Sequence, residues 1–148
     1  MSYENAMGYT GDLLASDAYK LLSSDAAAAL VDVRTQAEWA YVGVPDLNSI
    51  GKTPLFLEWR TLPPIQTDPD FPARLSAMLE AADVKSGAPL LFLCRSGHRS
   101  RQAAIAMTKA GWAPCFNVSD GFEGPLDPWR HRNVVGGWRA GSLPWLQT

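Results

Sequence analysis

Four short apolar runs, each ended by polar residues or a turn, restrict the fold of this chain more than any other feature. They are AALVDV (28–33), TPLFLEW (53–59), PLLFLC (89–94) and CFNV (115–118). Such runs are typical of strands that are buried on both faces, as in a parallel sheet. Because segments with helical spacing separate them, the sequence predicts an α/β fold with a mainly parallel sheet.

The segments between the runs have the spacing of helices. Apolar residues between Leu14 and Leu22 fall on one helical face, and RTQAEWAYVG closes at Gly43. A third pattern follows Asp70 with Pro72 in its first turn, and a fourth ends at Gly111. The stretch Leu62–Pro72 is rich in proline and turn formers, so it predicts a long loop.

Composition narrows the class of protein. The chain has 148 residues, 47% of them hydrophobic and 19% charged, which favours one globular domain. We expect a single domain over residues 12–148 after an N-terminal tail, residues 1–11. A net charge of -2 argues against nucleic-acid and membrane partners. The N-terminus has no apolar core of the kind that a signal peptide needs, so we expect a cytoplasmic protein.

The third run ends in a cysteine followed by unusual residues, CRSGHRS. Ligands of parallel sheets bind beyond the carboxyl ends of the strands, where Cys94 would lie. A helix dipole, loop amides and two arginines would favour its thiolate and would bind an anion. A cysteine kept only for packing needs no such loop. We therefore predict a catalytic Cys94 and an active-site loop that consists of Arg95, Ser96, Gly97, His98, Arg99 and Ser100.

Within that loop, Gly97 permits backbone conformations closed to other residues. Ser100 has two roles open to it, since it could cap the helix or donate to the sulfur. The helix is expected to start after Arg99.

Other polar residues have weaker claims to a functional role. Asp32 ends a strand near the predicted loop, so a supporting role and a purely structural role are both open. For Arg34 we favour pairing with an acid such as Glu38, which would order the turn. Cys115 is expected in the core. His131 is expected in solvent, and a metal site is not expected because no carboxylate cluster lies beside it.

Three segments together resemble the rhodanese family of sulfurtransferases, over about residues 12–144. CRSGHRS is similar to that family's active-site loop, with four residues between Cys94 and Arg99. LVDVRTQAEW resembles its first signature, and NVSDGFEG with the later GWRAGSLPW resembles its C-terminal signature. A departure from the family is PLDPWRHRNVV, Pro125–Val135, which separates the two halves of the last signature.

The resemblance implies a rhodanese-like fold, with about five mainly parallel strands and helices on both faces. It also implies a thiosulfate sulfurtransferase that moves a sulfane sulfur to a thiophilic acceptor through a Cys94 persulfide. No metal or organic cofactor is implied. The expected partners are a small sulfur donor and an acceptor, with a protein thiol as one candidate acceptor.

Two alternatives stay open. One is a sulfur carrier that delivers the persulfide to a protein partner. The other is a cysteine-based phosphatase or arsenate reductase on the same scaffold, which the short loop disfavours because related phosphatases have one more residue between Cys and Arg.

Overall fold

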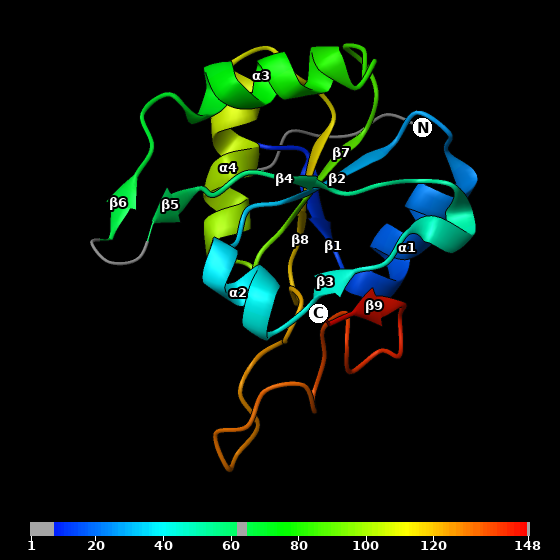
Figure 1. The fold of residues 1–148 in the computed structure, drawn as a ribbon, viewed down its shortest axis with the longest axis vertical. Coiled ribbons are helices and arrows are strands. Elements are labelled where there is room, and N and C mark those ends of the chain that lie inside the picture. Colours follow the sequence, from blue (N-terminus) through cyan, green and yellow to red (C-terminus); the bar gives the residue numbers. More distant parts are fainter. Residues whose placement is uncertain (1–7, 62–64, 148) are drawn as a thin grey trace.

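The computed structural model describes residues 8–61 and 65–147. Five parallel strands lie side by side at its centre (Figure 1). In spatial order they are β1 (Gly11–Leu13), β8 (Cys115–Val118), β7 (Leu90–Leu93), β2 (Ala29–Asp32) and β4 (Leu55–Phe56). The prediction of a five-stranded parallel sheet is thereby confirmed.

Alternation of side chains along the central strands explains why both faces are covered. Leu30 and Leu91 pair in register and pack on one face, whereas their neighbours Val31 and Phe92 pack on the other. All four are at most 1% exposed. Helix α1 (Ala15–Ser24) covers the first face, and α3 (Phe71–Ala81) with α4 (His98–Lys109) covers the second (Figure 1). The sheet therefore lies between two apolar layers.

Shorter elements connect these layers. Helix α2 (Gln36–Tyr41) begins with a capping box of Thr35 and Glu38. It leads to β3 (Val44–Pro45), the short helix η1 (Asn48–Ile50) and β4. Strand β9 (Trp145–Leu146) pairs antiparallel with β3, and β5 (Arg60–Thr61) pairs antiparallel with β6 (Gln66–Thr67).

The region after the second apolar run differs from the sequence prediction. Only Leu55–Phe56 forms β4, and the predicted loop Leu62–Pro72 contains β6 and the start of α3. Residues 62–64 lie outside the described residues. Trp59 packs edge-on against Phe71, with ring centroids 4.9 Å apart, so this tryptophan extends the core beside α3.

The domain includes residues from the predicted N-terminal tail. Tyr9 is 5% exposed within the core, and β1 begins at Gly11. Residues 1–7 lie outside the described residues.

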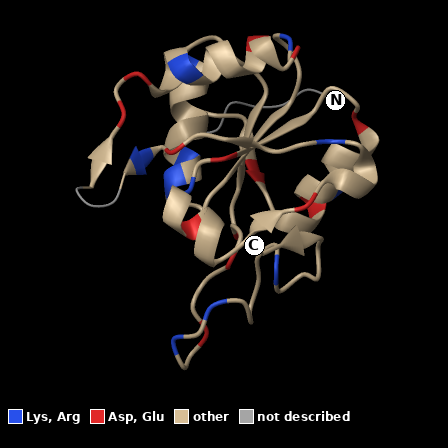
Figure 2. Ribbon diagram, in the orientation of Figure 1, with Lys and Arg blue, Asp and Glu red and all other residues tan. Residues whose placement is uncertain are grey.

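Residues 125–135, here called the arm, extend from the body of the domain (Figure 1). The arm carries four exposed apolar side chains, Leu126, Trp129, Val134 and Val135. It also carries arginines and one aspartate, which Figure 2 shows in blue and red. The amide of Asn133 donates to the carbonyl of Glu123 at 2.6 Å, so the far end of the arm returns to its starting point.

Within residues 8–61 and 65–147, every helix is too short or too polar to cross a membrane.

Candidate active site

Cys94 lies directly after β7, at the carboxyl edge of the sheet. The residue is 1% exposed, and its sulfur has two hydrogen-bond partners. The amide of Gly97 donates to Sγ at 3.2 Å, and Ser100 Oγ lies 3.1 Å from Sγ. The chain thus folds back over the sulfur and presents polar groups to it.

The loop around the sulfur is shorter than predicted. Helix α4 begins at His98 rather than after Arg99, and Gly97 is its N-cap residue with φ 105°. A side chain at position 97 would collide with the carbonyl of Ser119. Glycine is required here for both its positive φ and its lack of a Cβ. Ser100 therefore lies inside the first turn of α4, where its hydroxyl contacts the sulfur and caps no helix.

A second backbone segment supports the loop from the outside. The amide of Phe122 donates to the carbonyl of Cys94 at 2.8 Å, and that of Glu123 donates to the carbonyl of Arg95 at 3.0 Å. Gly121, with φ 69°, approaches so closely that an added Cβ would collide with Arg95. The segment NVSDGFEG therefore forms a rigid backing for the Cys94 loop.

Arg99 is engaged by a carboxylate rather than left free beside the sulfur. Its two terminal nitrogens donate to the two oxygens of Glu38 at 2.6 and 3.0 Å. The side chains are 10% and 17% exposed, so solvent screens this pair only partly. The structure thus corrects the expected partner of Glu38, which binds Arg99 and not Arg34.

The Arg99–Glu38 pair is electrostatically tight. Burial alone would raise the pKa of Glu38, but hydrogen bonds and charge from Arg99, together with Thr35, outweigh burial and lower that pKa below 4.5. Glu38 also keeps the pKa of Arg99 above its usual value, although burial opposes this. In its charged form, the pair of Glu38 and Arg99 links α2 to the first turn of α4.

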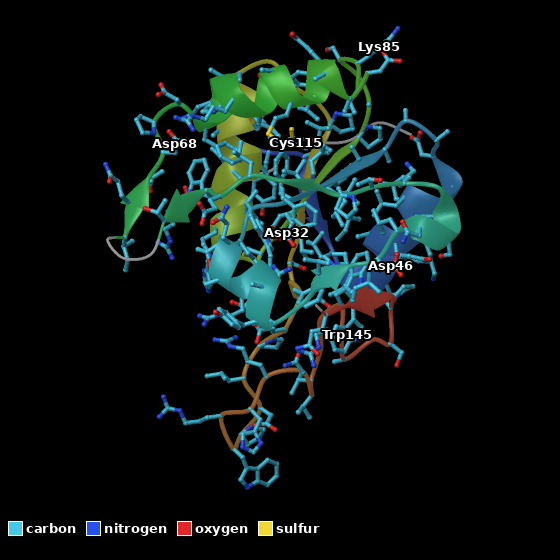
Figure 3. The ribbon with its side chains drawn as sticks, in the orientation of Figure 1. Asp32, Asp46, Asp68, Lys85, Cys115 and Trp145 are labelled. Carbon is cyan, nitrogen blue, oxygen red and sulfur yellow. The ribbon has the colours of Figure 1, made fainter. Side chains whose placement is uncertain are left out.

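Asp32 and Arg34 form a second ion pair, fully buried at the end of β2. Arg34 donates to Asp32 Oδ2 at 2.7 Å and to the carbonyl of Gly43 at 2.8 Å. Its guanidinium lies 4.2 Å from the ring centroid of Phe122, an attractive cation–π distance. Arg34 thus orders the turn, as predicted, while Asp32, labelled near the centre of Figure 3, pairs with it and holds it in place.

The remaining predicted site residues lie at the surface of the loop. Arg95 and His98 are exposed, and Ser96 is half-buried. Of the two cations expected near the sulfur, Arg95 is therefore the one open to solvent.

Sequence reasoning missed Asn117, which lies in β8 next to the site. The hydroxyl of Ser100 donates to Asn117 Oδ1 at 2.6 Å, and Asn117 Nδ2 donates to Asp12 Oδ1 at 3.0 Å. Asn117 is 3% exposed. A buried amide needs hydrogen-bond partners, so an asparagine inside the apolar run CFNV was a usable signal.

The other cysteine, Cys115, lies at the amino ends of the parallel strands, opposite the carboxyl ends where Cys94 lies. Cys115 pairs in register with Leu90, four residues before Cys94, so the two cysteines are about 13 Å apart along the strand direction. Burial raises the pKa of Cys115 to about 11. Figure 3 shows Cys115 beneath α3, within the core. A disulfide with Cys94 is excluded by this separation.

A groove of about 790 Å³ also lies at this amino edge, lined by residues such as Ala28, Lys52 and Pro89. Lys52 Nζ donates to the carbonyls of Asp25 and Ala28 there.

In the part of the chain that the structure describes, no three His, Cys, Asp or Glu side chains could together hold a metal ion.

The fold and the site define an α/β protein with one cysteine in a polar loop between a central strand and a helix. The family model for the rhodanese-like domain matches residues 14–125, and the chain belongs to that family. Membership supports a role in sulfurtransferase chemistry.

Relatives of known sequence agree with this assignment. An uncharacterized protein of Rickettsia conorii is 40% identical over 134 residues, which cover 90% of this chain and 95% of the relative. Rhodanese-like domain-containing protein 4, a chloroplastic protein of Arabidopsis thaliana, is 27% identical over 133 residues, or 90% of this chain and 25% of that protein.

Among solved structures, the crystal structure of Rv0390 from M. tuberculosis has a TM-score of 0.81 and 45% identity, and covers 95% of this chain and 99% of that one. A polysulfide-sulfur transferase homodimer from Wolinella succinogenes has a TM-score of 0.55 at 22% identity, covering 92% of this chain and 77% of that one, and shares the fold.

Proposed function

We propose that the protein is a sulfurtransferase that carries a sulfane sulfur as a persulfide on Cys94. The observation that carries the proposal is the sulfur's placement at the carboxyl edge of the sheet, 3.2 Å from the Gly97 amide and at the N-terminus of α4. Amide donors and the positive end of a helix stabilise an anionic sulfur.

The chemistry balances with thiosulfate as donor and cyanide as a test acceptor. The Cys94 thiolate attacks the outer sulfur of thiosulfate, a sulfur–sulfur bond forms, and the bond to the leaving sulfite breaks with its electron pair on sulfite. Cyanide then attacks the terminal sulfur of the persulfide, which releases thiocyanate and regenerates the thiolate. Neither step needs an oxidant or a reductant.

Charge supports a dianionic donor. Arg95 is exposed on the loop one residue after Cys94, and an exposed cation there attracts anions to the site. Arg99 contributes less than the sequence suggested, because Glu38 neutralises it at 2.6 Å. We therefore assign donor attraction mainly to Arg95, and loop rigidity to the Arg99–Glu38 pair.

A second function, delivery of the persulfide to a protein thiol, is favoured by the arm. The arm starts after Gly124, whose amide donates to the carbonyl of Arg95 at 3.2 Å, so it is attached to the active-site loop. Trp129 is 76% exposed beside the exposed Arg130. A protein acceptor with an acidic surface around its thiol would match this cationic and apolar segment.

The first experiment is the intact mass of the protein after thiosulfate treatment, followed by cyanide, with Cys94→Ser as the control. We expect a gain of one sulfur atom that cyanide removes and that the control never shows. If the wild-type protein gains no sulfur from thiosulfate, that donor is wrong, and polysulfide is tested next.

An Arg95→Ala variant then tests the donor assignment. We expect kcat/KM for thiosulfate to fall about tenfold, the loss of one charge contact, while turnover with a singly charged alkyl persulfide donor falls less. An equal loss with both donors would contradict electrostatic attraction by Arg95.

A further inference from the structure

We propose that Asn117 is a positioning residue that commits the hydroxyl proton of Ser100 and thereby makes Cys94 harder to deprotonate. The inference concerns the cysteine of the proposed function and rests on that function for its biological meaning. Its physical basis is a chain of hydrogen bonds that is buried at Cys94, Ser100 and Asn117 and ends at the exposed Asp12, and the direction of each bond is fixed by the next.

The first step is the orientation of the Asn117 amide. Its Nδ2 group lies 3.0 Å from Asp12 Oδ1 and 3.2 Å from the carbonyl oxygen of Gly97. A carbonyl oxygen only accepts hydrogen bonds, as does an ionised carboxylate. The NH₂ group must therefore face these oxygens, and Oδ1 must face the opposite way, toward Ser100.

The second step concerns the Ser100 hydroxyl. Asn117 Oδ1 lies 2.6 Å from Ser100 Oγ, and this oxygen can only accept. The hydroxyl has a single proton, which must point at Asn117. Ser100 is fully buried, so water does not offer it a different partner.

The third step follows for the cysteine. Since the proton of Ser100 is committed, Ser100 Oγ can only accept from Cys94, and the 3.1 Å contact is a thiol donating to a hydroxyl. Loss of the thiol proton breaks the S–H bond, sends the proton to a base in solvent, and leaves the electron pair on sulfur. The resulting anion faces the lone pairs of Ser100 unless the hydroxyl rotates away from Asn117. An amide does not accept the proton at neutral pH, so the chain opposes deprotonation and does not relay the proton.

The charged groups around the site are held by other partners. Glu38 pairs with Arg99, Asp32 pairs with Arg34, and Asp120 accepts from the amides of Ala15 and Gly137 at 2.8 and 3.0 Å. Asp12 accepts from Asn117 and from the Tyr9 hydroxyl at 2.8 Å. Arg95 and His98 are exposed on the loop. The Ser100 hydroxyl is the side-chain group in hydrogen-bond contact with the sulfur, and its rotation changes which partner receives its proton.

The test is the pH profile of iodoacetamide alkylation at Cys94, read by mass, in a cycle of Asn117→Leu, Ser100→Ala and the double variant. Leucine has nearly the shape of asparagine but accepts no hydrogen bond, so it frees Ser100 to donate to the thiolate. We expect the midpoint of the profile to fall by about one pH unit, or about tenfold in rate below the midpoint. The double variant should match Ser100→Ala alone.

Two results would overturn the proposal. One is a midpoint that stays or rises in Asn117→Leu. The other is the same downward shift in the Ser100→Ala background, because the effect would then bypass Ser100. Circular dichroism verifies that each variant is folded.

An infrared measurement covers the case in which Asn117→Leu does not fold. The S–H stretching band of Cys94, isolated by subtracting the spectrum of Cys94→Ala, should lie at the lowered frequency of a donating thiol and should rise in Ser100→Ala. An unchanged band would contradict the proposal. Because both measurements use no sulfur donor, their failure is distinct from a failure of persulfide formation.

Discussion

The two cysteines are equally buried but lie in opposite environments. Cys94 is 1% exposed and Cys115 is fully buried, and they lie beside two adjacent strands of the sheet, Cys94 just after β7 and Cys115 in β8. Cys94 follows the carboxyl end of β7, where it receives an amide hydrogen bond at the start of a helix. Cys115 begins β8 and donates to the carbonyl of Trp112 at 3.2 Å.

The comparison shows that two equally buried thiols can meet opposite hydrogen-bonding groups, an amide donor at Cys94 and a carbonyl acceptor at Cys115. Burial disfavours the charged form of Cys115 and raises the pKa of this thiol to about 11, although a hydrogen bond with Thr108 opposes the rise. At Cys94 the amide of Gly97 instead donates to the sulfur, and the Ser100 hydroxyl is its second hydrogen-bond partner. Position along the strand decides which set of backbone groups a cysteine meets.

The largest expected contrast is between substitutions of the two cysteines. Cys94→Ser should reduce cyanide-dependent thiocyanate release to the background rate, because no persulfide forms. Cys115→Ala should keep the rate within about twofold and cost about 1 kcal/mol of stability from the small cavity. Thiocyanate assays and urea unfolding of both variants measure this. Loss of activity in a folded Cys115→Ala protein would break the comparison.

The two ends of β7 can also be compared through glycines. Gly87 and Gly97 have similar φ values, 96° and 105°, but a Cβ at position 87 meets nothing within 4 Å. Gly87→Ala should therefore cost about 1–2 kcal/mol of backbone strain. Gly97→Ala adds a collision with Ser119 and should cost about 2–4 kcal/mol and most of the activity.

Urea unfolding measures both glycine variants. Equal destabilisation would mean that the loop moves away from Ser119 at no cost, and the rigid backing inferred for the carboxyl edge would be wrong.

The Arg99–Glu38 pair predicts a moderate dependence of stability on pH. The folded-state pKa of Glu38 lies below 4.5, so the unfolded chain takes up this proton first. The stabilisation is complete above the unfolded pKa and is lost as pH falls through the folded pKa. We expect about 1–2 kcal/mol from this pair, part of the value of charged hydrogen bonds. Urea unfolding at a series of pH values between 7 and 3 gives the free energy of unfolding at each pH. This free energy should fall less steeply with decreasing pH in Glu38→Gln than in the wild-type protein. An unchanged slope would mean that the pair does not couple to folding.

The smallest expected effect is at Cys115 itself. With a pKa of about 11, about one molecule in a thousand carries its thiolate at pH 8. Iodoacetamide at that pH should leave Cys115 unmodified in the folded protein, while both cysteines react in guanidinium chloride. Peptide mass mapping locates the label. Rapid labelling of Cys115 in the native protein would show that its environment opens.

The parallel sheet and the Cys94 loop could be predicted because their signals are local. The run PLLFLC is apolar at each position, and Arg95 to Ser100 follow it directly in the sequence. The helix start at His98 was missed because the polar residues that form its first turn resemble a loop.

The network behind the loop was less predictable because it joins distant parts of the sequence. Arg99 and Glu38 are 61 residues apart, and Asn117 and Asp12 are 105 apart. Their pairing depends on strand order, which a single sequence does not specify. Arg34 was matched to the wrong acid, since Asp32 is two residues away on the same buried strand end.

The base of the arm has a consequence for the evolution and engineering of this protein. Gly124 and Gly136 press together so closely that a Cβ at position 124 would collide with the carbonyl of residue 136. The two ends of the arm therefore lie next to each other where the arm joins the domain. Because closure entropy grows only with the logarithm of loop length, doubling the arm costs about 0.6 kcal/mol. New recognition sequences could be inserted there while the Cys94 loop keeps its shape.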